Sequence, residues 1–197
     1  MIVHEPITQT QVGMPMDEFI RLYEQEGPFE LIDGERIVKM PTVAGHAEII
    51  KLLNDLLAVL ERMGIIVRYT ESAFVLADRP DWVKGSRLPD LMVYRAERMA
   101  AYKAADPDWR SKPYVLVPDL CIEVISATDI YGDVEEKVLR YLEDGVQAVW
   151  VLNPRTHSVS VHMAGSRQSL RLLADDTLDG GAIIPGFAVP VRDLFAV

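Results

Sequence analysis

The stretch that most constrains the fold of this chain is PDLCIEVIS, residues 118–126. From residue 120 to 125 both alternating sets of positions are apolar, and Glu123 is the one charged residue among them. A strand with two apolar faces is typical of the centre of a sheet that is covered on both sides. A carboxylate at such a place costs several kcal/mol unless a charge or hydrogen bonds compensate it. The stretch therefore predicts a central strand and raises the question of what compensates Glu123.

Length and composition favour a soluble globular protein. The 197 residues are 49% hydrophobic and 25% charged, and we expect a flexible arm at 1–13 and a single domain at 14–197. The single cysteine, Cys121, lies in the apolar strand, so it excludes a disulfide framework. No apolar run approaches the roughly 20 residues that cross a bilayer, and the first residues lack the features of a signal peptide. We expect a cytoplasmic protein without a membrane partner.

The charge of the chain is unevenly distributed. The net charge of −10 argues against a nucleic-acid partner. Residues 61–112, however, hold 10 Lys and Arg against 8 Asp and Glu, a local charge of +2 (10 − 8). This segment contributes the candidate phosphate contacts Arg68, Arg79, Lys84 and Arg87. The alternative is that each belongs to an ordinary solvated surface.

Hydrophobic periodicity and turn residues predict an α/β or α+β fold. We expect helices at residues 16–26, 45–63, 96–104 and 129–144. A hairpin is expected at 29–40, where Asp33-Gly34 suits a two-residue turn, and a second one at 156–176. Segments 65–69 and 73–77 read as paired strands, residues 78–88 as a loop, and 88–94, 118–126 and 146–153 as further strands.

Four polar residues besides Glu123 lie where the pattern leads us to look for a site. Asp90 stands in a strand, Lys137 on the apolar stripe of a helix, His46 on the buried stripe of another, and Glu30 at the start of the first hairpin. Each also has a plain structural interpretation. Asp90 can simply follow a proline turn, and Lys137 can pair with Asp133. His46 can be a core histidine and Glu30 a solvated edge residue.

Taken together, these positions predict chemistry. Two carboxylates on neighbouring central strands can bind a hard divalent cation that keeps several waters and takes phosphate oxygens as further ligands. A lysine on the next helix can stabilise developing negative charge or orient the attacking water. Asp90, Glu123 and Lys137 therefore form the equipment for metal-assisted phosphodiester hydrolysis.

The chain resembles the PD-(D/E)XK nuclease superfamily, and more closely its Uma2 branch (the DUF820 group), in five stretches that cover nearly its whole length. These are FELIDGERIVKM followed by His46, RLPDLMVY, PDLCIEVISATD, DVEEKVLRYLEDGVQAVWVLNP and IIPGFAVPVRDLF. The resemblance implies a restriction-endonuclease-like core, in which helices flank a mixed central sheet and added β-hairpins accompany it. It also implies that the acidic site lies on two adjacent strands.

The family motifs carry over residue by residue. Asp90 matches the aspartate of the PD motif and Glu123 the acidic residue of the (D/E)XK motif. Ile125 stands where the superfamily usually has its lysine, and Lys137 matches the lysine that the Uma2 branch carries on the following helix. Glu30 and His46 match the N-terminal acidic and histidine positions of the branch. We reject Asp119 of the second PDL as the PD aspartate, because it would share one strand with Glu123.

The resemblance implies a Mg²⁺- or Mn²⁺-dependent endonuclease that acts on nucleic acid, with DNA as the expected substrate. Asp90, Glu123 and the backbone carbonyl of Val124 would hold the ion, and Lys137 would serve the attacking water or the phosphate. Glu30 and His46 would assist. A homodimer is expected by analogy with nucleases that cut two strands. Two alternatives remain open: a catalytically silent nuclease-fold module that binds nucleic acid or a protein, and an assembly protein in which Glu123 and Lys137 form an internal ion pair.

Overall fold

The computed structural model describes residues 12–39, 43–126 and 129–196. Its helices are α1 (Met16–Glu26), α2 (Ala44–Arg62), α3 (Ala96–Ala105) and α4 (Tyr131–Glu143), with short 3₁₀ turns η1 (Trp109–Ser111) and η2 (Val191–Phe195). The first eight strands are β1 (Met14–Pro15), β2 (Phe29–Ile32), β3 (Glu35–Val38), β4 (Ile66–Thr70), β5 (Phe74–Leu76), β6 (Trp82–Val83), β7 (Gly85–Arg87) and β8 (Leu91–Arg95). The others are β9 (Leu120–Val124), β10 (Ala148–Asn153), β11 (Ser158–Met163), β12 (Ser169–Leu172), β13 (Thr177–Asp179) and β14 (Ala188–Pro190).

The largest sheet has six strands in the order β12-β11-β10-β9-β8-β4. Strands β9 and β10 are parallel, and all the other neighbours are antiparallel. The parallel pair requires a crossover connection, which α4 supplies. The mixed α+β architecture predicted from the sequence is confirmed, and the crossover lays α4 over the strand that carries Glu123.

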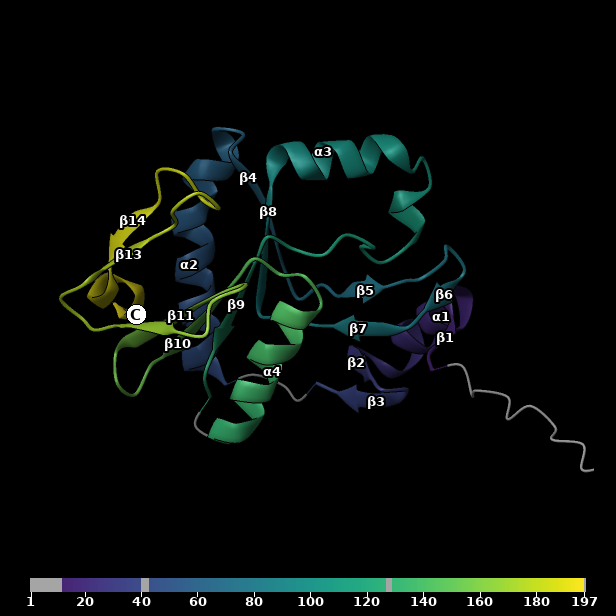
Figure 1. The fold of residues 1–197 in the computed structure, drawn as a ribbon, viewed down its shortest axis with the longest axis horizontal. Helices are drawn as coiled ribbons and strands as arrows, with labels where there is room; N and C mark the ends of the chain where they lie inside the picture. Colours follow the sequence, from purple (N-terminus) through teal and green to yellow (C-terminus); the bar gives the residue numbers. More distant parts are fainter. Residues whose placement is uncertain (1–11, 40–42, 127–128, 197) are drawn as a thin grey trace, which may run out of the picture.

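Helices cover both faces of this sheet (Figure 1). On one face α2 and η2 pack against residues such as Ile122, Val124 and Trp150. On the other, α4 packs with Val138 and Tyr141 against Cys121 and neighbouring residues of β8 and β10. Every residue of β9 is buried, because the strand lies inside the sheet and beneath helices on both sides. The prediction of a doubly covered central strand is confirmed.

A second sheet of four strands, in the order β3-β2-β7-β5, lies beside the first and packs with α1 (Figure 1). The predicted pairing of 65–69 with 73–77 is wrong: β4 pairs with β8, and β5 pairs with β7 in the other sheet. The chain turns away after β4 at Glu71, whose φ is +53°. Strand β7 forms inside the segment predicted as a loop and provides β5 with its partner.

The other predicted elements are confirmed with small shifts of their ends. Helix α1 has the predicted bounds, both hairpins form, and the first one turns at Asp33-Gly34. Residues 1–11 of the predicted N-terminal arm lie outside the described residues, and the carbonyl of Val12 accepts a hydrogen bond from the Trp82 indole at 3.1 Å. The division into an arm and one domain stays a prediction. Among the described residues, no helix has both the length and the apolar character to cross a membrane.

Candidate active site

The antiparallel pairing of β8 with β9 brings the two predicted carboxylates together. Leu91 is opposite Ile122, so the next step of the same register places Asp90 opposite Glu123. Asp90 Oδ2 also accepts a hydrogen bond of 2.9 Å from the backbone N–H of Val124. The side chains of Asp90 and Glu123 are 4% and 11% exposed. Two nearly buried carboxylates thus lie side by side at the end of β9.

Glu123 is compensated by two groups of α4. Lys137 Nζ donates to Glu123 Oε2 at 2.8 Å, and the Tyr141 hydroxyl donates to Oε1 at 2.6 Å. Lys137 and Tyr141 are four residues apart and therefore lie on one face of the helix. Burial raises the pKa of Glu123 above its usual range; the positive charge of Lys137 opposes the shift and the nearby charge of Asp90 adds to it. In the structure, the partners of Glu123 are therefore Lys137 and Tyr141.

Asp90 is held by a different set of donors. Lys39 Nζ lies 2.9 Å from Oδ1, and His46 Nε2 lies 3.1 Å from Oδ2. Burial favours the neutral acid, but the His46 contact, the Lys39 charge and the Val124 N–H outweigh it. The pKa of Asp90 consequently lies well below its usual range, and the carboxylate stays ionised at neutral pH.

Glu30 joins the site through the backbone. Its Oε1 accepts a hydrogen bond of 2.8 Å from the N–H of Leu88, two residues before Asp90. Burial lowers the pKa of Lys137, but the negative charges of Glu123, Glu30 and Asp90 raise it further than burial lowers it. The net pKa of Lys137 lies above its usual range, so its ammonium keeps its proton. The structure brings all five predicted residues, Glu30, His46, Asp90, Glu123 and Lys137, into one cluster.

Sequence reasoning missed two members of this cluster. Lys39 ends the first hairpin and also donates to the carbonyl of Leu88 at 3.2 Å, so it holds the start of β8 as well as Asp90. The signal was its place at the end of FELIDGERIVKM, but a lysine there reads as a solvated edge residue. Tyr141 belongs to the apolar stripe of α4, and a pattern of apolar positions does not show where its hydroxyl ends.

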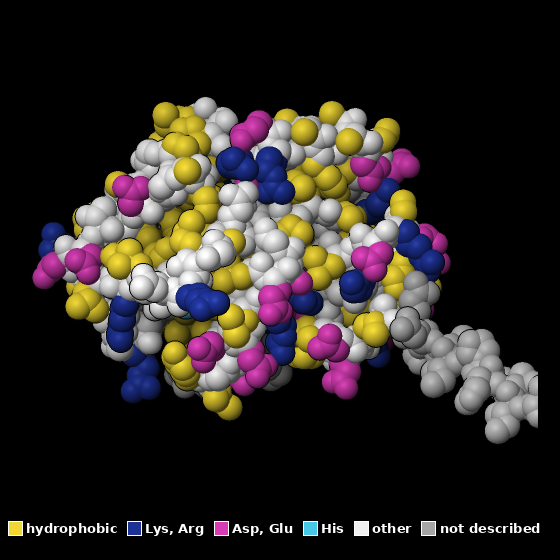
Figure 2. All heavy atoms as spheres, in the orientation of Figure 1, with side chains coloured by type: hydrophobic (Ala, Val, Ile, Leu, Met, Phe, Trp, Pro, Cys, Tyr) yellow, Lys and Arg dark blue, Asp and Glu magenta, His cyan; other side chains and the backbone are white. Residues whose placement is uncertain are grey.

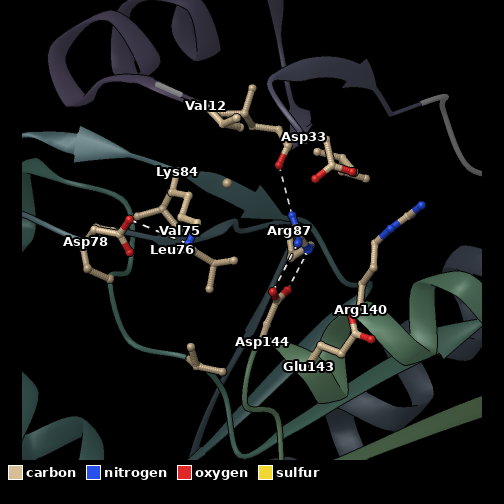
Figure 3. Close-up of a pocket in the computed structure, with 16 residues that line it drawn as sticks. Val12, Asp33, Val75, Leu76, Asp78, Lys84, Arg87, Arg140, Glu143 and Asp144 are labelled. Carbon is tan, nitrogen blue, oxygen red and sulfur yellow. Dashed lines mark hydrogen bonds and ion pairs between the residues drawn. The ribbon is translucent and has the colours of Figure 1, made fainter. Parts of the chain in front are cut away.

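The four predicted phosphate contacts do not join the site. Each pairs with an acidic residue: Arg68 with Glu61, Arg79 with Asp81 at 3.2 Å, Lys84 with Asp78 at 3.7 Å, and Arg87 with Asp144 at 2.7 Å. Arg87 is buried at the wall of a cavity of about 590 Å³, where it faces Asp144 (Figure 3). A buried, paired guanidinium is unsuited to a phosphate contact, so we do not retain Arg87 in that role.

The oxygen and nitrogen donors near Asp90 and Glu123 decide whether a divalent ion fits between these residues. No group of three or more His, Cys, Asp or Glu among the described residues is arranged to hold a metal ion. Asp90 and Glu123 nevertheless offer adjacent hard oxygen donors, with the backbone of Val124 against them. Mg²⁺ accepts such a set, because it usually binds through one or two carboxylates and keeps several waters. The residues fit an ion of that kind once Lys39 yields its place on Asp90.

The chain is similar to known proteins in sequence and in fold. A family model described as "Uma2: Putative restriction endonuclease" matches residues 16–192. Among solved structures, the fold is similar to that of "a putative nuclease belonging to DUF820" from Anabaena variabilis ATCC 29413. The two chains are 22% identical, the TM-score is 0.73, and the match covers 92% of this chain and 97% of that one, so the likeness shows the fold. The comparison with curated proteins gives no match.

Proposed function

The chain belongs to the Uma2 family, and from this premise and the geometry of the site we propose that it is a Mg²⁺- or Mn²⁺-dependent endonuclease that hydrolyses phosphodiester bonds of DNA. The observation that carries the proposal is the position of Asp90 opposite Glu123 with Lys137 at 2.8 Å from Glu123. An ion pair that only stabilises the fold would account for Glu123 and Lys137. It would not account for Asp90, the second nearly buried carboxylate beside them.

Each residue of the site has its own role in the proposed reaction. Asp90, Glu123 and the backbone carbonyl of Val124 would hold the divalent ion. When bound, that ion would polarise the scissile phosphate and make water a better nucleophile. Lys137 would neutralise the charge that develops on the phosphate or orient the attacking water. His46 positions Asp90, and Glu30 fixes Leu88 and sustains the charge of Lys137.

The first prediction tests these roles with plasmid DNA in Mg²⁺. The parent protein should nick the plasmid, and Lys137→Ala and Asp90→Asn should each lower the rate by at least about 100-fold, because each removes a group that acts on the transition state. Gel electrophoresis of nicked and supercoiled forms gives the rates. Lys51→Ala, at an exposed lysine of α2 paired with Asp55, is the control and should cleave like the parent. Equal cleavage by Lys137→Ala and the parent would remove the lysine from the mechanism.

One observation favours the alternative of a silent binding module. Each oxygen of Asp90 and Glu123 already has a cationic or hydrogen-bonding partner in the protein, so the cluster is satisfied without an ion. Titration with Mn²⁺ separates the two functions, because the module would show no affinity for the ion and the nuclease would. The homodimer and the cytoplasmic location stay predictions.

A further inference from the structure

A few basic side chains of the described residues have no partner. Across the described residues, nearly every Lys and Arg forms an ion pair, a hydrogen bond or a contact with an aromatic ring. The side chains that do none of these are Arg62, Arg155, Arg167 and Arg171. Arg155, Arg167 and Arg171 are exposed and line the same groove. In a chain of net charge −10, three unpaired arginines in one place form a local anion-attracting surface.

The groove lies between α4 and the outer strands of the six-stranded sheet, with a volume of about 760 Å³. Tyr131, 80% exposed at the start of α4, lines it together with Asn153 and Ser160. Figure 2 shows Lys and Arg side chains, with Asp and Glu among them, on the lower left of the molecule, where β10 and β11 lie in Figure 1. An aromatic ring, amide and hydroxyl groups and guanidinium groups are the set that binds bases and phosphates together.

Strand register connects the groove with the acidic site. Glu123 is opposite Val151, Val151 opposite Ser160, and Ser160 opposite Arg171, so the four residues form one row across β9, β10, β11 and β12. Directly opposed residues share a face of the sheet, which is here the face that α4 covers. Arg171 therefore stands about 14 Å from the strand of Glu123, three strand spacings of about 4.8 Å. Ile125 and Ser126, which follow Val124, also line the groove.

The groove also contains acids, and they leave it with a small positive charge. Asp129 and Glu135 line it, which gives +1 against the three arginines (3 − 2) with His162 neutral. Asp129 is engaged locally, since its Oδ2 accepts a hydrogen bond from the Ser126 N–H at 2.7 Å. Glu135 is exposed and forms no hydrogen bond or ion pair within the described part of the chain, so the groove sets three unpaired arginines against one unpaired carboxylate.

We infer that this groove binds one nucleic-acid strand and leads it to the carboxylates of the proposed nuclease site. Arg155, Arg167 and Arg171 contact the phosphates, and Tyr131 stacks on a base. The inference rests on the proposed function and adds to it a substrate class, single-stranded nucleic acid. Because Asp90 and Glu123 are nearly buried, a flexible single strand reaches them more readily than a rigid duplex.

The test, our second prediction, is strand binding measured without cleavage. Fluorescence anisotropy of a labelled oligothymidylate of about 12 nucleotides in EDTA gives the affinity at several salt concentrations. The variant Arg155→Gln/Arg167→Gln/Arg171→Gln should bind at least tenfold more weakly than the parent. Its slope of log affinity against log salt should fall by about 2, since each phosphate contact to a single strand contributes about 0.7. All three residues are exposed, so circular dichroism should show an unchanged fold.

A matched control changes the same charge elsewhere. Arg79→Gln/Lys84→Gln/Arg192→Gln replaces three exposed basic residues that pair with acids and lie outside the groove. This control should bind within about twofold of the parent. It removes the same amount of positive charge but no side chain of the groove, so it measures the effect of net charge alone. Equal weakening in both triple variants would overturn the groove assignment, and so would absence of binding by the parent.

Two further outcomes separate the inference from the proposed function. A duplex of the same length should bind more weakly than the single strand, and equal or tighter duplex binding would overturn the single-strand class. Lys51→Ala, outside both the groove and the acidic site, should bind the strand like the parent. Suppose that neither the parent nor any variant cleaves DNA, and that Arg155→Gln/Arg167→Gln/Arg171→Gln is the one variant that loses strand binding. The inference then stands and the nuclease proposal fails. If the groove variant instead changes the oligomeric state in sedimentation and keeps its strand affinity, the groove is an interface between copies and the inference is wrong.

Discussion

At the residue scale, the central fact is that Asp90 and Glu123 are compensated by different neighbours. Glu123 depends on Lys137 and Tyr141, both from α4, while Asp90 depends on Lys39, which follows β3, and on His46 of α2. Glu123 and Lys137 form an ion pair in which each charge compensates the other. Lys39 instead occupies an oxygen of Asp90 that would otherwise be free to hold a divalent ion.

The third prediction follows from that position of Lys39. Lys39→Ala should raise the affinity for Mn²⁺ about fivefold, because removal of a competing ammonium from a nearly buried carboxylate is worth about 1 kcal/mol. Electron paramagnetic resonance of free Mn²⁺ during titration measures the affinity directly, with no need for catalysis.

Two controls define the result. Lys39→Arg keeps the charge and should leave the Mn²⁺ affinity near that of the parent. Lys51→Ala removes a lysine distant from the site and should also change nothing. If Lys39→Ala binds Mn²⁺ more weakly than the parent, Lys39 supports the ion instead of competing with it.

At the scale of the element, α2 has two separate tasks. Its first turn carries His46 to Asp90, and the remaining turns pack Ile49, Leu53, Leu57 and Leu60 against the sheet. The 3.6-residue period places all of these on one stripe. The position of His46 therefore depends on the packing of leucines two to four turns further along the helix.

The fourth prediction separates packing from exposure on α2. Leu57→Ala should lower the free energy of unfolding by about 2–5 kcal/mol, because Leu57 is completely buried and its loss leaves a cavity. Val59→Ala, on the exposed side, should change it by less than about 0.5 kcal/mol. Urea unfolding followed by circular dichroism measures both. Similar losses in the two variants would mean that the helix is not packed as described.

At the scale of the whole molecule, an ion pair with little exposure to solvent ties the four-stranded sheet to α4. Arg87 of β7 pairs through Nε and Nη2 with Asp144, the residue that follows α4, and both side chains are about one tenth exposed. Figure 3 shows the two side chains facing each other from the two parts of the fold. Arg87 also donates to the carbonyl of Leu31 at 3.0 Å. The pair fixes α4, and with it Lys137, relative to the sheet that carries Glu30.

The fifth prediction is a double-mutant cycle on this pair. Asp144→Leu alone should lower the free energy of unfolding by about 3–5 kcal/mol, because it leaves a buried guanidinium without its partner. Adding Arg87→Met should recover at least about 1 kcal/mol, since the second change removes that uncompensated charge. Urea unfolding of the parent, of Asp144→Leu, of Arg87→Met and of the double variant gives the coupling energy. A single variant as stable as the parent would show that the pair contributes nothing to holding the parts together.

Much of the fold and the site could be predicted from residues near in sequence. Apolar periodicity placed the four helices, the turn residues placed both hairpins, and the two apolar faces of 120–125 identified the central strand. A carboxylate in that strand, and a lysine on an apolar stripe fourteen positions later (137 − 123), were visible because each violates its local pattern. A buried charge costs free energy unless it is compensated. A charged residue at an apolar position therefore predicts a partner of opposite charge.

Only the tertiary structure decided which groups far apart in sequence meet. The partner of β5, the contact of Lys39 with Asp90 and the hydroxyl of Tyr141 on Glu123 all depend on register and packing between distant elements. The pairing state of each arginine is likewise invisible in a count of charges. For that reason the basic segment 61–112 drew attention to arginines and lysines that are paired. Three of the unpaired arginines, Arg155, Arg167 and Arg171, lie in the groove beside α4, since a charge attracts phosphate only where the fold leaves it without a nearer partner.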